Sequence, residues 1–338
     1  MPPPACHPFA GAASGALPSV KSEPLTMHKK LLLTLLLAAS PCYAGLDQGM
    51  TAFASGDFAT ALHELQPLAV HGDAAAQNKL GQMYAQGSGV KQDATQAINW
   101  FRKSAQQHYV AACTNLALVY SQGLGVKPDS KQATLWFEKA ATYGTAADRD
   151  TLGLRYATGQ DVPENLGRAM HWFAIAARQG DADAQYNLGR GYNQGLGQKK
   201  DERQGFAWTL KAAQQGLALA EGQVGIMYDR GMGTAQDYHQ ARQWYEKAAD
   251  HGSAQAMNNL SLLYANGHGV PADNFQAFVW AEIVHLTGHD NPLQLSTVLA
   301  AKLTEDQRKQ GEAAARKWLD QHHVSLPEAA AAVSGTHS

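Results

Sequence analysis

The chain has 338 residues, of which 45% are hydrophobic and 17% are charged. A chain of this length and composition can bury a large core, which excludes general disorder. The formal net charge of −2 gives no electrostatic reason to expect a nucleic-acid partner, and no hydrophobic run is long enough to span a bilayer. We therefore expect a folded protein that does not bind nucleic acid and does not span a membrane.

The N-terminal region has the layout of a segment that is removed after export. A short basic head starts at Met27, an apolar run follows it, and small residues precede a cleavage position after Ala44. This is the order of regions in a secretory signal peptide. We interpret residues 27–44 as a signal peptide and residues 1–26 as an over-extended, disordered N-terminus before the true start. The expected location is periplasmic, or secreted.

One pattern of 36 residues recurs six times between residues 76 and 288, with no insertion or deletion. Each copy carries a tyrosine, then a glycine, then a tryptophan, at constant spacing. The tyrosines are Tyr84, Tyr120, Tyr156, Tyr192, Tyr228 and Tyr264; the glycines are Gly87, Gly123, Gly159, Gly195, Gly231 and Gly267; the tryptophans are Trp100, Trp136, Trp172, Trp208, Trp244 and Trp280. A fixed period of this size is typical of a solenoid built from stacked supersecondary units.

Within one copy, the spacing predicts two antiparallel helices. Ala76, Leu80 and Tyr84 fall on one face of a helix. Gly81 lies beside that face, and a small residue there implies the close approach of a neighbouring helix, since glycine lowers helix propensity. Gly87 is predicted to end this first helix in the left-handed conformation.

The second helix of each copy is predicted to start at an acidic or amide residue. These residues, all good N-caps, are Asp93, Asp129, Asn165, Asp201, Asp237 and Asp273. In five of the six copies a glutamine follows three residues later, as Gln96 does in the first copy. This is a capping-box pattern, so we expect the glutamine side chain to bond the backbone N–H of the cap residue.

These residues together resemble a known family. The motif A-x-x-x-L-G-x-x-Y-x-x-G-x-G-V-x-x-D-x-x-x-A-x-x-W-[FY]-x-x-A-A-x-x-G is similar to the Sel-1-like repeat, a relative of the tetratricopeptide repeat. The resemblance implies an all-α fold, an α/α solenoid in the form of a right-handed superhelix, with six helix–turn–helix repeats over residues 74–288. Asp161 departs from the motif at the second turn glycine, and Gln198 and Thr234 depart from it at the turn valine.

The segments on either side of the repeats are predicted to be helical caps, which a solenoid needs to cover its open ends. Residues 45–73 resemble a second helix without a full first helix of its own. Residues 289–323 are predicted to form C-terminal capping helices, with Thr304 and Gln307 as a further capping pair and Trp318 over the last exposed edge of the core. Residues 324–338 have the composition of a flexible tail.

The motifs that suggest chemistry are incomplete. His63 and Glu64 begin like a zinc-protease helix, but Pro67 stands where the second histidine is needed. The histidines lack metal-ligand spacing, and Cys113 has no histidine or acid placed beside it by the sequence. Some Sel-1-like proteins are associated with β-lactam binding or hydrolysis, but this chain lacks their cysteine pairs. We expect no catalytic residue, no metal site and no cofactor, hence no enzyme.

The variable outer positions of the first helices are the candidate partner-binding residues. By resemblance to tetratricopeptide folds, they are expected to line the concave side of the superhelix. They are Asn78, Gln82, Gln86, Thr114, Leu118, Gln122, Leu154, Tyr186, Arg190, Gln194, Ile226, Arg230, Asn258 and Leu262. The apolar members form a stripe that suits a protein or peptide ligand. Alternatively, the stripe packs against the helix of the neighbouring repeat.

The favoured function is a non-catalytic, monomeric scaffold or adaptor in the periplasm that binds a protein or peptide partner. The resemblance also implies an alternative, because some exported Sel-1-like proteins are immunity proteins that neutralise a secreted antibacterial effector. A β-lactamase-like hydrolase is the less favoured alternative. The sequence alone does not decide between the first two, since both require a protein partner.

Overall fold

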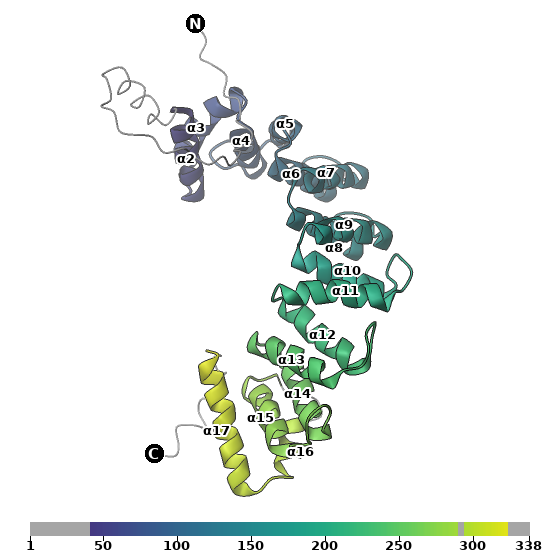
Figure 1. Ribbon diagram of the computed structural model, residues 1–338. Coiled ribbons are helices and arrows are strands. Elements are labelled where there is room, and N and C mark those ends of the chain that lie inside the picture. The colour runs from purple at the N-terminus through teal and green to yellow at the C-terminus, as the bar shows by residue number, and fades with distance from the viewer. Residues whose placement is uncertain (1–40, 290–293, 324–338) are drawn as a thin grey trace, which may run out of the picture. The chain divides into compact units, whose positions relative to one another are not determined.

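The computed structural model describes residues 41–289 and 294–323, and the side chains from residue 45 onward. The predicted N-terminal extension, the apolar part of the signal peptide and the predicted tail lie outside the described residues. All regular elements in the described ranges are α-helices (Figure 1). They are α2 (Pro41–Ala54), α3 (Phe58–Val70), α4 (Ala74–Gln86), α5 (Ala94–Gln106), α6 (Val110–Gln122), α7 (Ser130–Tyr143), α8 (Ala146–Thr158), α9 (Leu166–Arg178), α10 (Ala182–Gln194), α11 (Glu202–Gln214), α12 (Ala218–Arg230), α13 (Tyr238–Asp250), α14 (Ala254–Asn266), α15 (Asn274–Leu286), α16 (Leu295–Ala300) and α17 (Glu305–Gln321).

The six predicted repeats are six helix pairs, from α4/α5 to α14/α15, and each pair packs on the next within its unit. This confirms the predicted α/α solenoid. The chain divides into two compact units. Unit 1 contains α2 to α7 together with residues 159–163, and unit 2 contains α8 to α17.

Two glycines shape the turn in five of the six repeats, and Asp161 replaces the second one in the third repeat. Gly87 ends α4 with φ of 74° in the left-handed region, as predicted. Gly89, the second turn glycine, has φ of 72°, and a Cβ placed on it would lie 2.7 Å from the Cβ of Phe58. Phe58 is the first residue of α3, so this turn rests directly on the start of the preceding second helix. The position needs glycine both for its conformation and for its contact.

At the start of each second helix, only one of the two predicted capping hydrogen bonds forms. The side chain of Asp93 accepts a hydrogen bond from the N–H of Gln96 at 3.0 Å. The backbone N–H of Asp93, however, donates to the carbonyl of Tyr84 at 2.9 Å, and the same bond recurs in the other five repeats. The expectation that the glutamine side chain bonds this N–H is therefore wrong, because the first helix of the same repeat already supplies an acceptor.

The core of each repeat forms where small residues allow the two helices to meet. A Cβ on Gly81 would lie 2.6 Å from the ring of Phe101, which confirms the predicted close approach of α4 and α5. Ala76 and its equivalents Ala112, Ala184, Ala220 and Ala256 have no exposed surface. The repeat tryptophans lie at the rim of this core, and in four repeats a lysine one turn later covers the ring, as Lys103 covers Trp100 at 4.1 Å.

The opening unit has a complete first helix. Helix α2 pairs with α3, and Ala52 belongs to the buried cluster that these helices share with α4. The expectation of a second helix without a full first helix is therefore wrong. Helix α2 begins at Pro41 and so extends across the predicted cleavage position after Ala44.

The C-terminal cap matches its prediction closely. Thr304 and Gln307 form the reciprocal capping box at the start of α17. The ring of Trp318 packs edge-on against Trp280 with centroids 5.7 Å apart, and Gly311 lies against Phe278 so closely that a Cβ would be 2.6 Å from its ring. Helix α17 thus covers the end of the last repeat.

The third repeat departs from the others at its start. Asp148 takes the place of the fully buried alanine, and its carboxylate accepts hydrogen bonds from the N–H and the hydroxyl of Thr145 at 2.7 and 2.8 Å. Gly144, just before, has an extended backbone with φ of −84°, whereas Gly180 and Gly216 adopt positive φ. The division between the two units falls at this departure.

Candidate functional site

In unit 1, the predicted partner-binding positions do not all face solvent. Asn78 is buried, and its Oδ1 accepts a hydrogen bond from Nδ2 of Asn115 at 2.8 Å, so it joins α4 to α6. Thr114 and Leu118 are half-buried, as is Gln82. Gln86 and Gln122, at the ends of these helices, are exposed.

In unit 2, the apolar stripe divides into two kinds of position. Leu154 on α8 and Leu262 on α14 are exposed, with 43% and 37% of their surface accessible. Ile226 on α12 packs against a core cluster that its own repeat shares with the following one, and Tyr186 on α10 does the same against the cluster that contains Val224. The alternative of packing against a neighbour therefore holds for Ile226 and Tyr186 and not for the two leucines.

The polar members in unit 2 lie mainly at the surface. Arg190, Gln194 and Arg230 are exposed, and Asn258 is half-buried. The guanidinium of Arg190 lies 5.9 Å from the ring centroid of Tyr186, which holds the cation close to α10. We call the exposed part of these predicted positions in each unit the first-helix surface. In unit 2 it includes leucines, arginines and an amide.

A buried carboxylate lies on the same helix as Leu154. Asp150 on α8 is 7% exposed, and its Oδ1 accepts a hydrogen bond from Nδ2 of Asn187 at 3.0 Å. Burial raises the pKa of Asp150 to about 6, and the nearby carboxylates of Asp181 and Asp183 add to this effect. The contact joins α8 to α10 in the way that Asn78 and Asn115 join α4 to α6.

A second polar contact recurs between the first helix of a repeat and the end of its second helix. In repeats one and four it is an amide pair, in which Gln107 donates to Gln77 and Gln215 donates to Gln185, both at 2.9 Å. In the fifth repeat the same positions hold Glu221, buried, and His251, whose Nδ1 lies 2.7 Å from the carboxylate. The constant separation of 30 residues is the sequence signal that identifies these pairs.

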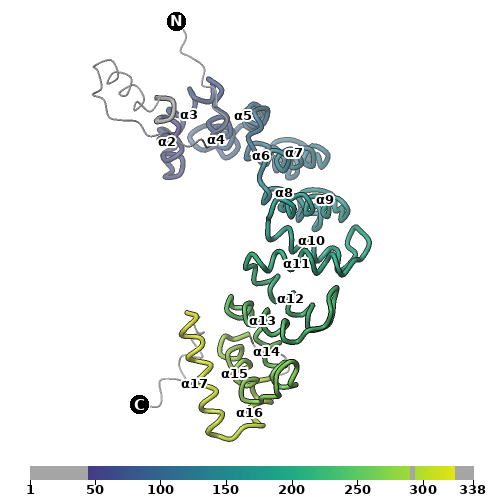
Figure 2. The backbone as a smooth tube through the Cα atoms, viewed as in Figure 1, coloured from purple at the N-terminus to yellow at the C-terminus, as the bar shows by residue number. Residues whose placement is uncertain are grey.

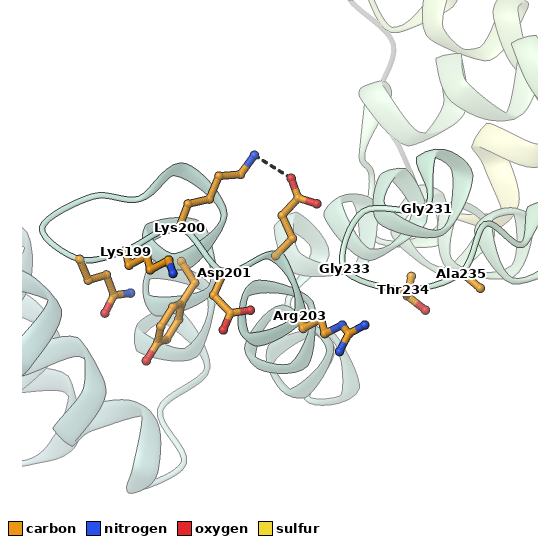
Figure 3. Close-up of a pocket in the computed structure, with 11 residues that line it drawn as sticks. Lys199, Lys200, Asp201, Arg203, Gly231, Gly233, Thr234 and Ala235 are labelled. Atoms are coloured by element: carbon orange, nitrogen blue, oxygen red, sulfur yellow. Dashed lines mark ion pairs between the residues drawn. The ribbon is translucent and has the colours of Figure 1, made fainter.

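A groove opens between two turns of unit 2, and none of the predicted partner-binding residues is among those that line it. The turns after α10 and α12 both project on this side (Figure 2) and together line an open groove of about 1210 Å³. Figure 3 shows Lys199, Lys200 and Arg203 on one side of the groove and Thr234 on the other. Gln198 also lines it.

The residues considered for catalysis or metal binding take other roles. His63 is exposed beside Glu64, and Pro67 lies inside α3. Cys113 is fully buried in the core of unit 1, and burial raises the pKa of its thiol, which disfavours the reactive thiolate. Across residues 41–289 and 294–323, no three histidine, cysteine or acidic side chains gather as a metal site requires.

Tandem helix pairs with glycine-bounded turns define an α/α-repeat protein. The Sel1 repeat model matches residues 74–109, 110–142, 152–181, 182–217, 218–253 and 254–283. The chain belongs to the Sel1 repeat family. Sel1 repeats mediate protein–protein interactions and generally form non-catalytic scaffolds. In the described part of the chain, no helix is both long enough and apolar enough to cross a membrane.

Solved structures of Sel1 repeat proteins resemble this one. A protective antigen of uropathogenic Escherichia coli is 28% identical with a TM-score of 0.61, over 88% of this chain and 64% of that chain. This chain thus spans less than two thirds of that relative. A Sel1 repeat protein from Oxalobacter formigenes is 29% identical with a TM-score of 0.48, over 70% of this chain and 95% of that chain.

An immunity protein from Pseudomonas aeruginosa is 18% identical with a TM-score of 0.32, over 75% of this chain and 84% of that chain. A similarity of this size carries no argument about function. A comparison with curated proteins finds no match.

Proposed function

We propose that the protein is an exported, non-catalytic scaffold of the periplasm that binds a partner protein or peptide on its first-helix surface. The observation that carries the proposal is the exposure of Leu154 and Leu262 at equivalent places in the third and sixth repeats. Each is held on a helix whose other face is packed, so exposing it costs free energy that a partner's apolar surface would recover.

The polar residues around these leucines suit a protein partner. Arg190 and Arg230 are exposed and Gln194 supplies an amide, on the first helices that come between those of the two leucines in the chain. An apolar centre with a polar rim is the usual anatomy of a protein interface, and arginine is enriched there. The rigid helical pairs keep these side chains in place before binding, which lowers the entropic cost of association.

The test is a crosslinking capture from a native periplasm with a chain that starts at Gly45. The variant bait carries Leu154→Glu and Leu262→Glu. The control carries Leu135→Glu, because Leu135 has a similar exposure of 42% but lies on a second helix. We expect one identified partner to be captured by the wild type and the control and lost from the double variant. Equal capture by all three baits overturns the assignment of the first-helix surface.

The identity of the captured partner decides the role. Several partners held without loss of their activity support the scaffold. A single effector that the protein inhibits in a one-to-one complex replaces the scaffold with the immunity role. Export is tested separately by sequencing the N-terminus of the protein recovered from cells, where we expect Gly45. A mature chain that keeps residues before Gly45 contradicts the predicted cleavage.

A further inference from the structure

The turns of the fourth and fifth repeats differ from those of the other repeats at one position. Four repeats place a valine there: Val90, Val126, Val162 and Val270. Each of Val90, Val126 and Val270 packs against its local core cluster, and Val162 is buried. The fourth and fifth repeats hold Gln198 and Thr234 instead, and both residues line the groove. The groove therefore opens where two adjacent turns lack the valine that is packed or buried in the other four repeats.

Glutamine in place of valine at position 198 leaves a buried donor without a partner. The Nε2 atom of Gln198 is inaccessible to solvent and has no hydrogen-bond partner in the described structure. An unpaired buried amide donor destabilises the fold, so such groups need a reason. Valine at this position, as in four other turns, would carry no such cost. Rotation of the Gln198 side chain toward the groove that it lines would let the amide donate to an acceptor oxygen of a ligand.

Along the groove, the charged side chains that take part in neither a helix cap nor an ion pair are positive. The carboxylate of Asp201 caps α11 by accepting from the N–H of Gln204 at 3.1 Å, and Glu202 pairs with Lys200 at 2.7 Å (Figure 3). Lys199 and Arg203 are exposed, and within the described part of the chain neither forms an ion pair. A chain with a net charge of −2 thus presents two cationic side chains without ion pairs along this groove.

We propose that this turn groove binds an extended acidic peptide segment, as a second interaction surface separate from the first-helix surface. The groove, at about 1210 Å³, is large for a single inorganic ion, and its open form admits a continuous chain. Carboxylates of the peptide pair with Lys199 and Arg203, and a peptide or side-chain carbonyl accepts from Gln198. Asp201 and Glu202 in the same groove favour a peptide with spaced carboxylates over the continuous charge of a nucleic-acid backbone.

The test uses the intact chain and a defined probe. A fluorescein-labelled ten-residue peptide of alternating Glu and Ser is titrated with the protein, and anisotropy gives Kd. A peptide with Gln in place of each Glu, and an oligothymidylate of ten nucleotides, are the comparison probes. We expect binding of the Glu peptide alone, weakened at least tenfold by Lys199→Glu with Arg203→Glu. Equal binding of the Gln peptide or of the oligonucleotide overturns the proposal.

Two further variants keep the result interpretable. Lys127→Glu is the matched control, because Lys127 occupies the place of Lys199 in the second repeat and is exposed outside the groove; its Kd should equal that of the wild type. Gln198→Val restores the residue of the other repeats, so the fold should become more stable while Kd rises at least threefold. A purely structural Gln198 would change stability and leave Kd unchanged, which contradicts the proposal.

The outcome is independent of the proposed scaffold function. The Leu154→Glu and Leu262→Glu variant should bind the Glu peptide with the Kd of the wild type. Loss of peptide binding in that variant shows that the peptide occupies the first-helix surface and overturns the groove assignment. Loss of the captured partner together with unchanged peptide binding places the two interactions on different surfaces.

Discussion

Asn187 donates a hydrogen bond from Nδ2 to the buried carboxylate of Asp150 at 3.0 Å, in the place where Asn115 donates to the amide of Asn78 at 2.8 Å. The two contacts join neighbouring first helices in the same way, one with a charge and one without. The chain thus contains its own uncharged counterpart of a contact that is costly when ionised.

Asp150→Asn should stabilise the protein at neutral pH. The pKa of Asp150 is raised from 3.8 to about 6 in the fold, so ionisation disfavours the folded state as pH rises from about 4 to 6. Removing the charge should add about 1–2 kcal/mol above pH 6, since the carboxylate retains some access to water. Urea midpoints at pH 4 and pH 7.5 measure this. The gain should be present at pH 7.5 and small at pH 4; a gain equal at both values contradicts the role of ionisation.

Gly89→Ala should destabilise unit 1 by about 3 kcal/mol, because the new Cβ meets Phe58 and the left-handed backbone is strained. The matched control is Gly56→Ala. Gly56 has φ of 82°, and nothing lies within 4 Å of a Cβ placed there. The control should lose only about 1 kcal/mol from backbone strain. Comparison of thermal midpoints separates the contact from the conformation, and equal losses would show that the contact with Phe58 is unimportant.

His251→Ala should cost about 2–3 kcal/mol, because it leaves the buried Glu221 carboxylate without the imidazole that lies 2.7 Å from it. The double variant Glu221→Gln with His251→Gln recreates the amide pair of the first and fourth repeats. We expect it to unfold within about 0.5 kcal/mol of the wild type. Urea denaturation measures both variants. A double variant as unstable as His251→Ala would show that the two positions are not exchangeable between repeats.

Trp318→Ala should loosen the C-terminal cap. Loss of the half-buried indole removes its edge contact with Trp280 and its packing on the last core cluster, at a cost of about 2 kcal/mol. Hydrogen exchange should then increase in α17 before it increases in the helices of the fourth repeat. Lys317→Ala is the control, since Lys317 is exposed on the same helix. Unchanged protection of α17 in the tryptophan variant would mean that other contacts hold the cap.

The helix pairs could be predicted from the sequence because their determinants lie within one period. Gly87 ends a helix, Asp93 caps the next, and Gly81 admits Phe101, all inside a single copy. The capping bond of Gln96 could not be predicted, because it depended on whether another acceptor reached the same N–H, and the carbonyl of Tyr84 does. Competition between acceptors is a property of the folded turn.

The candidate surface was predictable only in part, since exposure depends on the neighbouring repeat. Asn78 and Ile226 occupy outer positions of their helices, but Asn78 bonds Asn115 of the next repeat and Ile226 packs against a core cluster that extends into the next repeat. Leu154 and Leu262 occupy the equivalent place to Ile226 and remain exposed. The turn departures Gln198 and Thr234 were visible in the sequence, but only the stacking of successive turns shows that they line one groove.

The contact between a turn glycine and the start of the preceding second helix has a consequence for how the array can change length. Gly89 rests on Phe58, and Gly269 rests in the same way on Tyr238, so a junction of this kind is assembled from two halves supplied by adjacent copies. Duplication or loss of a whole 36-residue segment joins halves that still fit. A shift of one residue within the turn places a side chain where only a hydrogen atom has room. Growth by entire copies is the route that this geometry leaves open.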